Sequence, residues 1–141
     1  MQRKGSAVWQ GDLRNGKGTV STETGVVADA PYTFGTRFED APGTNPEELI
    51  AAAHAACFSM AFSGQLANAG LTADRIDTTA NLTLERLEPG FTITAIHLDV
   101  SAKVPGASRE AFDKAANTAK ETCPVSRLLN TKITMDAKLE S

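Results

Sequence analysis

Charged side chains are absent from one long stretch: residues 49–73 contain no Lys, Arg, Asp or Glu. A surface helix would show a charged face, so a helix in this stretch has to be covered on nearly all sides. We do not expect it to span a membrane, because no basic flank precedes it and polar side chains interrupt it. These polar residues are His54, Ser59, Ser63, Gln65 and Asn68.

Cysteine is also scarce, with two in 141 residues, which excludes a secreted disulfide scaffold. Together with two histidines, they are too few and too scattered for a metal signature. A formal net charge of −3 gives no basic surface for nucleic acid or an anionic membrane. No apolar run follows the first residues, so we expect no signal peptide and a cytoplasmic protein. In that compartment a disulfide is transient and chemical rather than structural.

The length predicts a single domain over residues 1–141, without repeats or linkers. Within it, one long helix is predicted from Pro46 to Ala69, roughly 36 Å long. Asn45 is a suitable N-cap, Glu48 stands where a capping-box acid would, and Gly70 is suited to the C′ position.

Alternating polar and apolar residues predict strands on both sides of this helix. Residues 5–38 read as short strands joined by tight turns, the last of them at 32–38 with Arg37 on the face opposite its aromatic residues. After the helix we expect a strand hairpin with a bulge near Ala95, two helices and a final strand. The hairpin strands are expected at 76–85 and 91–100. The helices are expected from 108 and from 123 to about 129, and the final strand at 133–139. The fold class is α+β with antiparallel sheets.

The two thiols differ in their surroundings. Cys57 lies in the middle of the long helix, where no helix N-terminus supports a thiolate and apolar neighbours raise a thiol pKa. An inert, buried cysteine is one interpretation of it. Cys123 stands at the N-cap position before Pro124, where the helix dipole favours a thiolate.

A reactive Cys57 needs a cation, and Arg37 is the best candidate near it in the sequence, although a paired surface arginine would look the same. Glu47 or Glu48 could hold the guanidinium, or simply favour the first helical turn. Glu47 precedes Cys57 by ten residues, roughly 15 Å along a straight helix. The helix therefore begins later or bends, or Glu47 serves a neighbouring subunit.

His54 lies three residues before Cys57 on the same side of the helix. It could form a Cys–His pair or be a packing residue in a polar pocket. His97 lies on a strand and has no local partner in the sequence. The chain has no Gly-rich phosphate loop and no Gly-x-Ser-x-Gly elbow.

Three segments, Asn45–Leu49, Ala53–Met60 and Cys123–Ser126, together resemble the osmotically inducible OsmC branch of the OsmC/Ohr family. The likeness covers nearly the whole chain. Further matching segments lie at 18–23, 38–39, 43–45 and 76–80.

The resemblance implies a cytoplasmic thiol peroxidase of the oxidative and osmotic stress response that reduces organic hydroperoxides, and hydrogen peroxide less well. It implies antiparallel sheets wrapped around long central helices in an intertwined homodimer, with active sites at the subunit interface. By resemblance, Cys57 is the peroxidatic cysteine, Cys123 the resolving cysteine, Arg37 the arginine and Glu47 the glutamate of the site. It implies no bound cofactor, and an external dithiol as reductant. In the Ohr branch this dithiol is a dihydrolipoyl group.

A homodimer is also expected from the residues, because a helix without charge needs more cover than short strands of one chain give. Two other functions remain open. A hot-dog-type thioesterase would use Glu47 or Glu48 as the catalytic acid, and a redox sensor or lipid-binding module would not be an enzyme at all.

Overall fold

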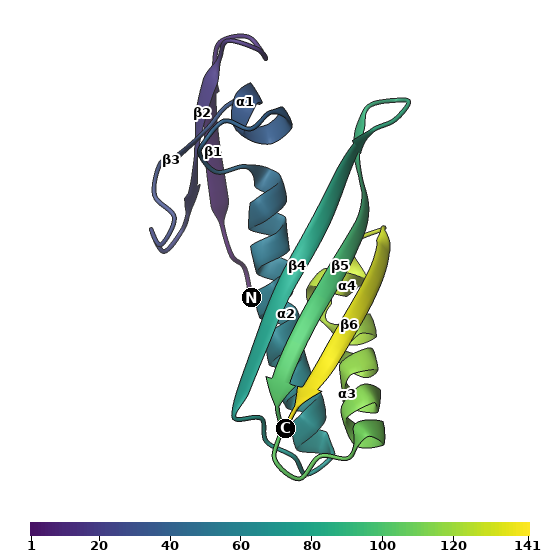
Figure 1. Cartoon of the computed structure of the whole chain (residues 1–141). Coiled ribbons are helices and arrows are strands. Elements are labelled where there is room, and N and C mark those ends of the chain that lie inside the picture. The colour runs from purple at the N-terminus through teal and green to yellow at the C-terminus, as the bar shows by residue number, and fades with distance from the viewer. The chain divides into compact units, whose positions relative to one another are not determined.

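The six strands form two three-stranded sheets, β1-β2-β3 and β4-β5-β6 (Figure 1). The computed structural model describes residues 1–141. The sheets belong to two compact units, Met1–Leu49 and Ile50–Ser141. The helices and the two sheets confirm the α+β class, and the expectation of a single domain stays a prediction.

In the first unit, β1 (Gly5–Gln10), β2 (Lys17–Thr22) and β3 (Ala30–Tyr32) are antiparallel. The predicted strand at 32–38 is wrong, because β3 ends at Tyr32 and a short helix, α1 (Phe34–Phe38), follows.

The helix forms because Thr33 and Thr36 make a reciprocal capping box, which satisfies the backbone locally. The sequence pattern was ambiguous, since residues four apart share a face in a strand and in a helix alike. Phe34 and Phe38 are such a pair, with ring centroids 5.0 Å apart.

The long helix is confirmed as α2 (Pro46–Asn68). Asn45 caps it, since its Oδ1 accepts the Glu48 N–H at 2.7 Å. Gly70 adopts φ 73°, the left-handed conformation that ends helices. The next N–H along the chain then bonds the Leu66 carbonyl at 2.9 Å, as in a Schellman motif.

In the second unit, β4 (Arg75–Arg86) and β5 (Phe91–Lys103) form the predicted antiparallel hairpin. Its register shifts where Thr83 faces Ala95 and Leu84 faces Ile93, which confirms the bulge. The last strand, β6 (Lys132–Glu140), runs parallel to β5 and not antiparallel.

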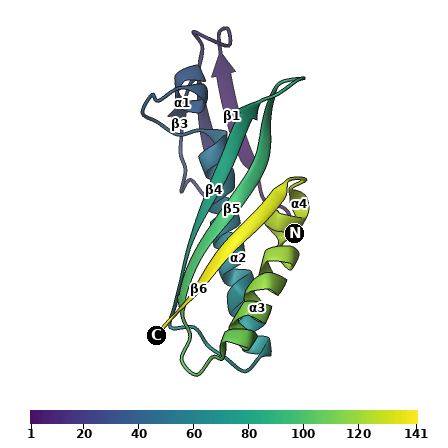
Figure 2. The same cartoon turned by 45° about the vertical axis from the view of Figure 1, so that its right-hand side comes forward.

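The connection between β5 and β6 explains this parallel pairing. It holds α3 (Arg109–Thr122) and α4 (Pro124–Leu128), and a crossover through helices brings a following strand back in the same direction. In both views α2 and α3 lie on one side of the β4-β5-β6 sheet (Figures 1 and 2).

One face of that sheet and the two helices enclose the core of the second unit. Phe62 of α2 stands at its centre, with its ring 5.7 Å from that of Phe58 and edge-on to Phe112 of α3 at 5.2 Å. Ile96 and Leu98 of β5 are fully buried against this group. Burial of each such side chain is worth about 1.5–3 kcal/mol.

The opposite side of α2 is exposed in the single chain, and the expectation that a partner subunit covers it stays a prediction. Met60 is 82% exposed. Its exposed neighbours are small and uncharged: Ala52, Ala53, Ala56, Ser63, Gly64 and Ala67.

By length and composition alone α2 could also cross a membrane, a test that core helices of soluble proteins pass as well. Phe58 and Phe62 of α2 are core residues of this chain.

Candidate active site

The second unit brings the two cysteines together. Cys123 is the N-cap of α4, and its Sγ accepts the Ser126 N–H at 3.3 Å, as expected for the cap position. The half-buried Cys57 of α2 lies close enough to the Cys123 thiol for the two to interact electrostatically. Both sulfurs therefore lie beside the first turn of α4.

Burial raises the pKa of the Cys57 thiol, and the Cys123 thiol beside it raises it further. The backbone N–H of Val125, at the start of α4, bonds the Cys57 sulfur and lowers this pKa. The expectation that no helix N-terminus supports Cys57 is therefore wrong. The supporting turn belongs to α4, far from Cys57 in the sequence.

A buried chain of polar groups continues from the cysteines. Ser126 Oγ lies 3.2 Å from Cys123 Sγ and 2.8 Å from His54 Nε2. His54 is fully buried, and its Nδ1 has no hydrogen-bond partner in the chain. Burial lowers the pKa of His54, which keeps the ring neutral near pH 7. Of the two sequence interpretations, the hydrogen bond favours a histidine in a polar pocket.

The first unit brings Arg37 and Glu47 together. Arg37 Nη2 donates to Glu47 Oε1 at 2.5 Å, and Nε donates to Oε1 at 3.2 Å and to Oε2 at 3.3 Å. The guanidinium also lies 4.9 Å from the ring centre of Phe38, instead of on the opposite face. Glu48, the other carboxylate considered, accepts a hydrogen bond from the Thr44 hydroxyl at 2.6 Å.

Asn45 positions Arg37 and Glu47 relative to each other, because it hydrogen-bonds both to α1 and to the start of α2. Its Nδ2 donates to the Thr36 carbonyl at 3.0 Å while its Oδ1 caps α2. Gly43 permits the close approach, because a Cβ there would lie 2.9 Å from Thr36 Cγ2 and its φ is 139°. The residues that lead into α2 therefore set the distance between Arg37 and Glu47.

An aromatic cavity of about 210 Å³ lies beside Arg37 in the same unit. Apart from the arginine and Thr33 its walls are apolar or aromatic: Trp9, Leu13, Tyr32, Phe34 and Phe38. The cavity can hold a small apolar group next to a cation.

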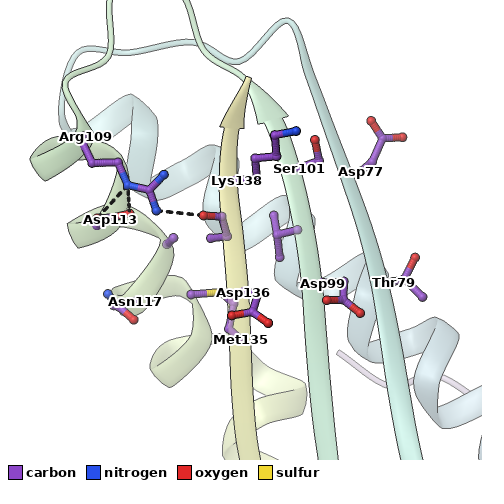
Figure 3. Close-up of a pocket in the computed structure, with 13 residues that line it drawn as sticks. Asp77, Thr79, Asp99, Ser101, Arg109, Asp113, Asn117, Met135, Asp136 and Lys138 are labelled. Carbon is purple, nitrogen blue, oxygen red and sulfur yellow. Dashed lines mark hydrogen bonds and ion pairs between the residues drawn. The ribbon is translucent and has the colours of Figure 1, made fainter. Parts of the chain in front are cut away.

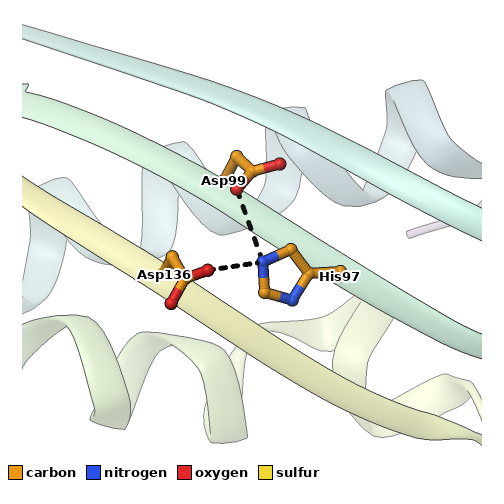
Figure 4. A group of neighbouring side chains, drawn as sticks. All are labelled: His97, Asp99 and Asp136. Carbon is orange, nitrogen blue, oxygen red and sulfur yellow. Dashed lines mark hydrogen bonds and ion pairs between the residues drawn. The ribbon is translucent and has the colours of Figure 1, made fainter.

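A second cluster lies on the outer face of the β4-β5-β6 sheet (Figure 4). His97 Nε2 lies 3.0 Å from Asp136 and 3.4 Å from Asp99, and Nδ1 lies 2.5 Å from the Thr134 hydroxyl. The expectation that His97 has no local partner is wrong, since Asp99 lies two residues further along β5. Thr134 and Asp136 are partners on the neighbouring β6 that the sequence did not indicate. The three ligand atoms lie within 4.8 Å of one another and are the candidate metal group of the chain, but hydrogen bonds of the His97 ring to Thr134 and Asp136 account for its position without an ion.

A cavity of about 580 Å³ lies between α3 and the sheet strands, and no cysteine lines it (Figure 3). Arg109 is held there by Asp113 at 2.9 Å and by the Ala137 carbonyl at 3.0 Å. Asp99 and Asp136 also line it, so it adjoins the His97 cluster.

The family model described as OsmC-like protein matches residues 38–138. The chain belongs to the OsmC family. The peroxiredoxin OsmC of Escherichia coli is 53% identical over 141 residues, which cover 100% of this chain and 99% of that protein. The organic hydroperoxide resistance protein OhrB of Bacillus subtilis is 32% identical over 124 residues, 87% of this chain and 88% of that protein.

Solved structures share the OsmC fold. An OsmC-like protein from Vibrio cholerae superposes with a TM-score of 0.76 at 16% identity, over 97% of this chain and 99% of that one. The OhrB crystal structure gives a TM-score of 0.69 at 23% identity, over 97% and 98% of the two chains. At these identities the likeness establishes the fold, not the activity.

Proposed function

We propose that this OsmC-family protein is a thiol peroxidase that reduces organic hydroperoxides to alcohols, and hydrogen peroxide more weakly. The observation that carries the proposal is that the free cysteines Cys57 and Cys123 lie close enough to interact beside α4. Its relatives support it, since they are named peroxiredoxin and organic hydroperoxide resistance protein. A cytoplasmic location and the absence of a bound cofactor belong to the same proposal.

In the first step the Cys57 thiolate attacks the distal oxygen of the hydroperoxide. An S–O bond forms, the O–O bond breaks, and the alkoxide takes a proton and leaves as the alcohol. The thiolate is the nucleophile, so groups that lower the pKa of Cys57 accelerate this step. The Val125 N–H is one such group, and Arg37 is proposed as the other.

In the second step the Cys123 sulfur attacks the sulfur of the Cys57 sulfenic acid. An S–S bond forms, the S–O bond breaks, and water leaves. An external dithiol then supplies two electrons and two protons to restore both thiols. A dihydrolipoyl group is one such dithiol.

We propose that the cation reaches Cys57 from a second copy of the chain. Because α2 begins at Pro46, the helix does not start after Glu47, and ten residues of α-helix separate Glu47 from Cys57 by roughly 15 Å. The exposed, uncharged side of α2 around Met60 gives a homodimer an apolar surface to bury. In this proposal Arg37, held by Glu47 of the same chain, serves Cys57 of the partner.

The aromatic cavity beside Arg37 suggests how the substrate is selected. Its walls suit an alkyl or aryl group, while the guanidinium can attract the peroxide oxygens. Hydrogen peroxide has no apolar group to bury there, which accounts for the proposed preference for organic hydroperoxides.

The contacts argue against the thioesterase alternative, since Glu47 is engaged by Arg37 and Glu48 by Thr44. Acyl-CoA hydrolysis that survives changing both cysteines to serine would support that alternative. Rapid turnover with excess hydroperoxide and a dithiol would exclude a non-enzymatic sensor or lipid-binding module.

The proposal is tested with dihydrolipoamide, cumene hydroperoxide and two single variants. Cys57→Ser should be inactive, because the sulfur that accepts oxygen is gone. Cys123→Ser should consume about one equivalent of peroxide and stop at an oxidised Cys57. Normal turnover of Cys123→Ser with the same dithiol would contradict the resolving role.

The two-chain site is tested by mixing. Cys57→Ser and Arg37→Ala proteins are unfolded together and refolded, and activity is measured. If the site uses two chains, a mixed dimer has one site with both defects and one with neither, so activity returns. Absent activity despite proven mixed dimers would contradict the assignment and leave the peroxidase proposal intact.

A further inference from the structure

The resolving step needs a group that takes the proton of the Cys123 thiol, and the two-cysteine mechanism above does not name one. Cys123 is fully buried, so bulk water is not beside it. The polar atoms at its sulfur are the Cys57 thiol and the hydroxyl and N–H of Ser126. Of these, only the Ser126 hydroxyl leads on to a base.

That base is His54. Its Nε2 lies 2.8 Å from Ser126 Oγ, which lies 3.2 Å from Cys123 Sγ. His54 comes from α2 and the other two residues from the start of α4, so the contact forms across the core and not from sequence proximity. Ser126, like His54, is buried, and solvent does not compete for the hydrogen bonds.

We propose that Ser126 and His54 form a proton relay that serves the resolving thiol Cys123. Ser126 contacts the reacting sulfur and transfers the proton. His54 does not contact that sulfur and accepts the proton by way of Ser126. This inference rests on the proposed peroxidase function and adds a route for the proton of its second step.

When Cys123 sulfur bonds to Cys57 sulfur, its proton passes to Ser126 Oγ, and the Ser126 hydroxyl proton passes to His54 Nε2. The hydroxide that leaves Cys57 takes a proton from the Ser126 hydroxyl, Ser126 recovers its proton from His54 Nε2, and the products are the disulfide and one water. His54 begins and ends neutral, and no further oxidant or reductant is needed.

The surroundings of His54 suit a transient acceptor. Its pKa is lowered by burial alone, without a contribution from any carboxylate or cation of α2 or α4. The only other titratable groups in the chain of contacts are the two thiols. A neutral ring has one nitrogen free to accept, and a buried imidazolium returns its proton readily because burial disfavours the charge.

The hydrogen bonds among His54, Ser126 and Cys123 could also serve the structure alone, and conservative variants distinguish that role from a proton relay. His54→Gln can still hydrogen-bond to Ser126 but cannot accept a proton near neutral pH. Ser126→Thr keeps the hydroxyl, whereas Ser126→Ala removes it. Folding of each full-length variant is checked by its urea unfolding midpoint.

Each protein receives one equivalent of cumene hydroperoxide without reductant and is quenched with acid at successive times. The mass of the intact protein is then measured by mass spectrometry. Gain of one oxygen reports the first step and loss of two hydrogens reports the disulfide. In His54→Gln and Ser126→Ala the oxygen should be gained at the wild-type rate. The disulfide should form on the order of 10- to 100-fold more slowly, the range of a lost general base. Ser126→Thr should resemble wild type.

The pH profile gives the sharper readout. With the relay, disulfide formation should vary little with pH above the titration of His54. Without it, the rate should rise about tenfold per pH unit, because hydroxide must remove the proton. Wild-type rates and profiles in both His54→Gln and Ser126→Ala, or equal slowing of both steps, would overturn the relay. Should wild type gain neither oxygen nor disulfide, the peroxidase proposal fails and the relay with it. If His54→Gln does not fold, the Ser126 pair alone decides between these outcomes.

Discussion

Glu47 offers the clearest test of how the arginine is positioned. Glu47→Gln keeps the length of the side chain but removes its charge and one of the two oxygens that Arg37 contacts. Glu48→Gln is a matched control in the same helical turn, since Glu48 bonds Thr44 and not Arg37. Both variants lose one negative charge.

The contacts set the size of the expected effect. A hydrogen bond to a charged group is worth about 1.5–3 kcal/mol, and each 1.36 kcal/mol is tenfold in rate. If that energy is what holds Arg37 in its active position, Glu47→Gln slows Cys57 oxidation on the order of 10- to 100-fold. Because Arg37 is 34% exposed and Glu47 12%, solvent screens the pair only in part, and the free energy of unfolding should fall by no more than that one hydrogen bond, about 1.5–3 kcal/mol.

The assay is the second-order rate constant for oxidation of Cys57 by cumene hydroperoxide, measured by rapid quench, with urea unfolding of the same samples. Glu48→Gln should react within about twofold of wild type, since it leaves Arg37 in place. Equal rate constants for Glu47→Gln and Glu48→Gln would refute the positioning role of Glu47.

Three further predictions follow from the same contacts. Arg37→Ala should move the pH profile of Cys57 oxidation to higher pH, because burial raises the thiol pKa and the opposing cation is gone; an unchanged profile would count against the pairing. The lowered pKa of His54 means that the unfolded chain binds its proton more tightly, so stability should fall as pH drops below about 6.5. Urea unfolding of His54→Gln should show a smaller loss there than wild type. Met60→Glu should weaken the dimer in analytical ultracentrifugation, because the charge would be buried in the interface; a dimer of wild-type strength would exclude that face of α2.

The elements that sequence could predict are those specified by neighbouring residues. The long helix carries its own cap, Asn45, and its own stop, Gly70, so its limits were correct within a residue. Cys123 before Pro124 identified the N-cap of α4 for the same reason. The segment at 32–38 was misassigned because its aromatic spacing fits two structures, and only the Thr33–Thr36 capping box decides between them.

The contacts that sequence could not predict join distant elements. The Val125 N–H supports Cys57, and Ser126 bonds His54, only because α4 packs beside α2. His97 finds its partners because β6 runs parallel to β5 and places Thr134 opposite it. No periodicity near Cys57 or His97 carries that information. The sequence offered Arg37, Glu47 and Glu48 as candidates, and the contacts distinguish between the two glutamates.

The central claim is that Cys57 and Cys123 form a working pair, and peptide mapping after oxidation tests it most directly. The reduced protein is treated with one equivalent of cumene hydroperoxide, digested without reductant and analysed by mass spectrometry. We predict one dominant cross-linked species that joins the Cys57 peptide to the Cys123 peptide and disappears on treatment with dihydrolipoamide. Two unlinked thiol peptides with the peroxide still unconsumed would contradict the account.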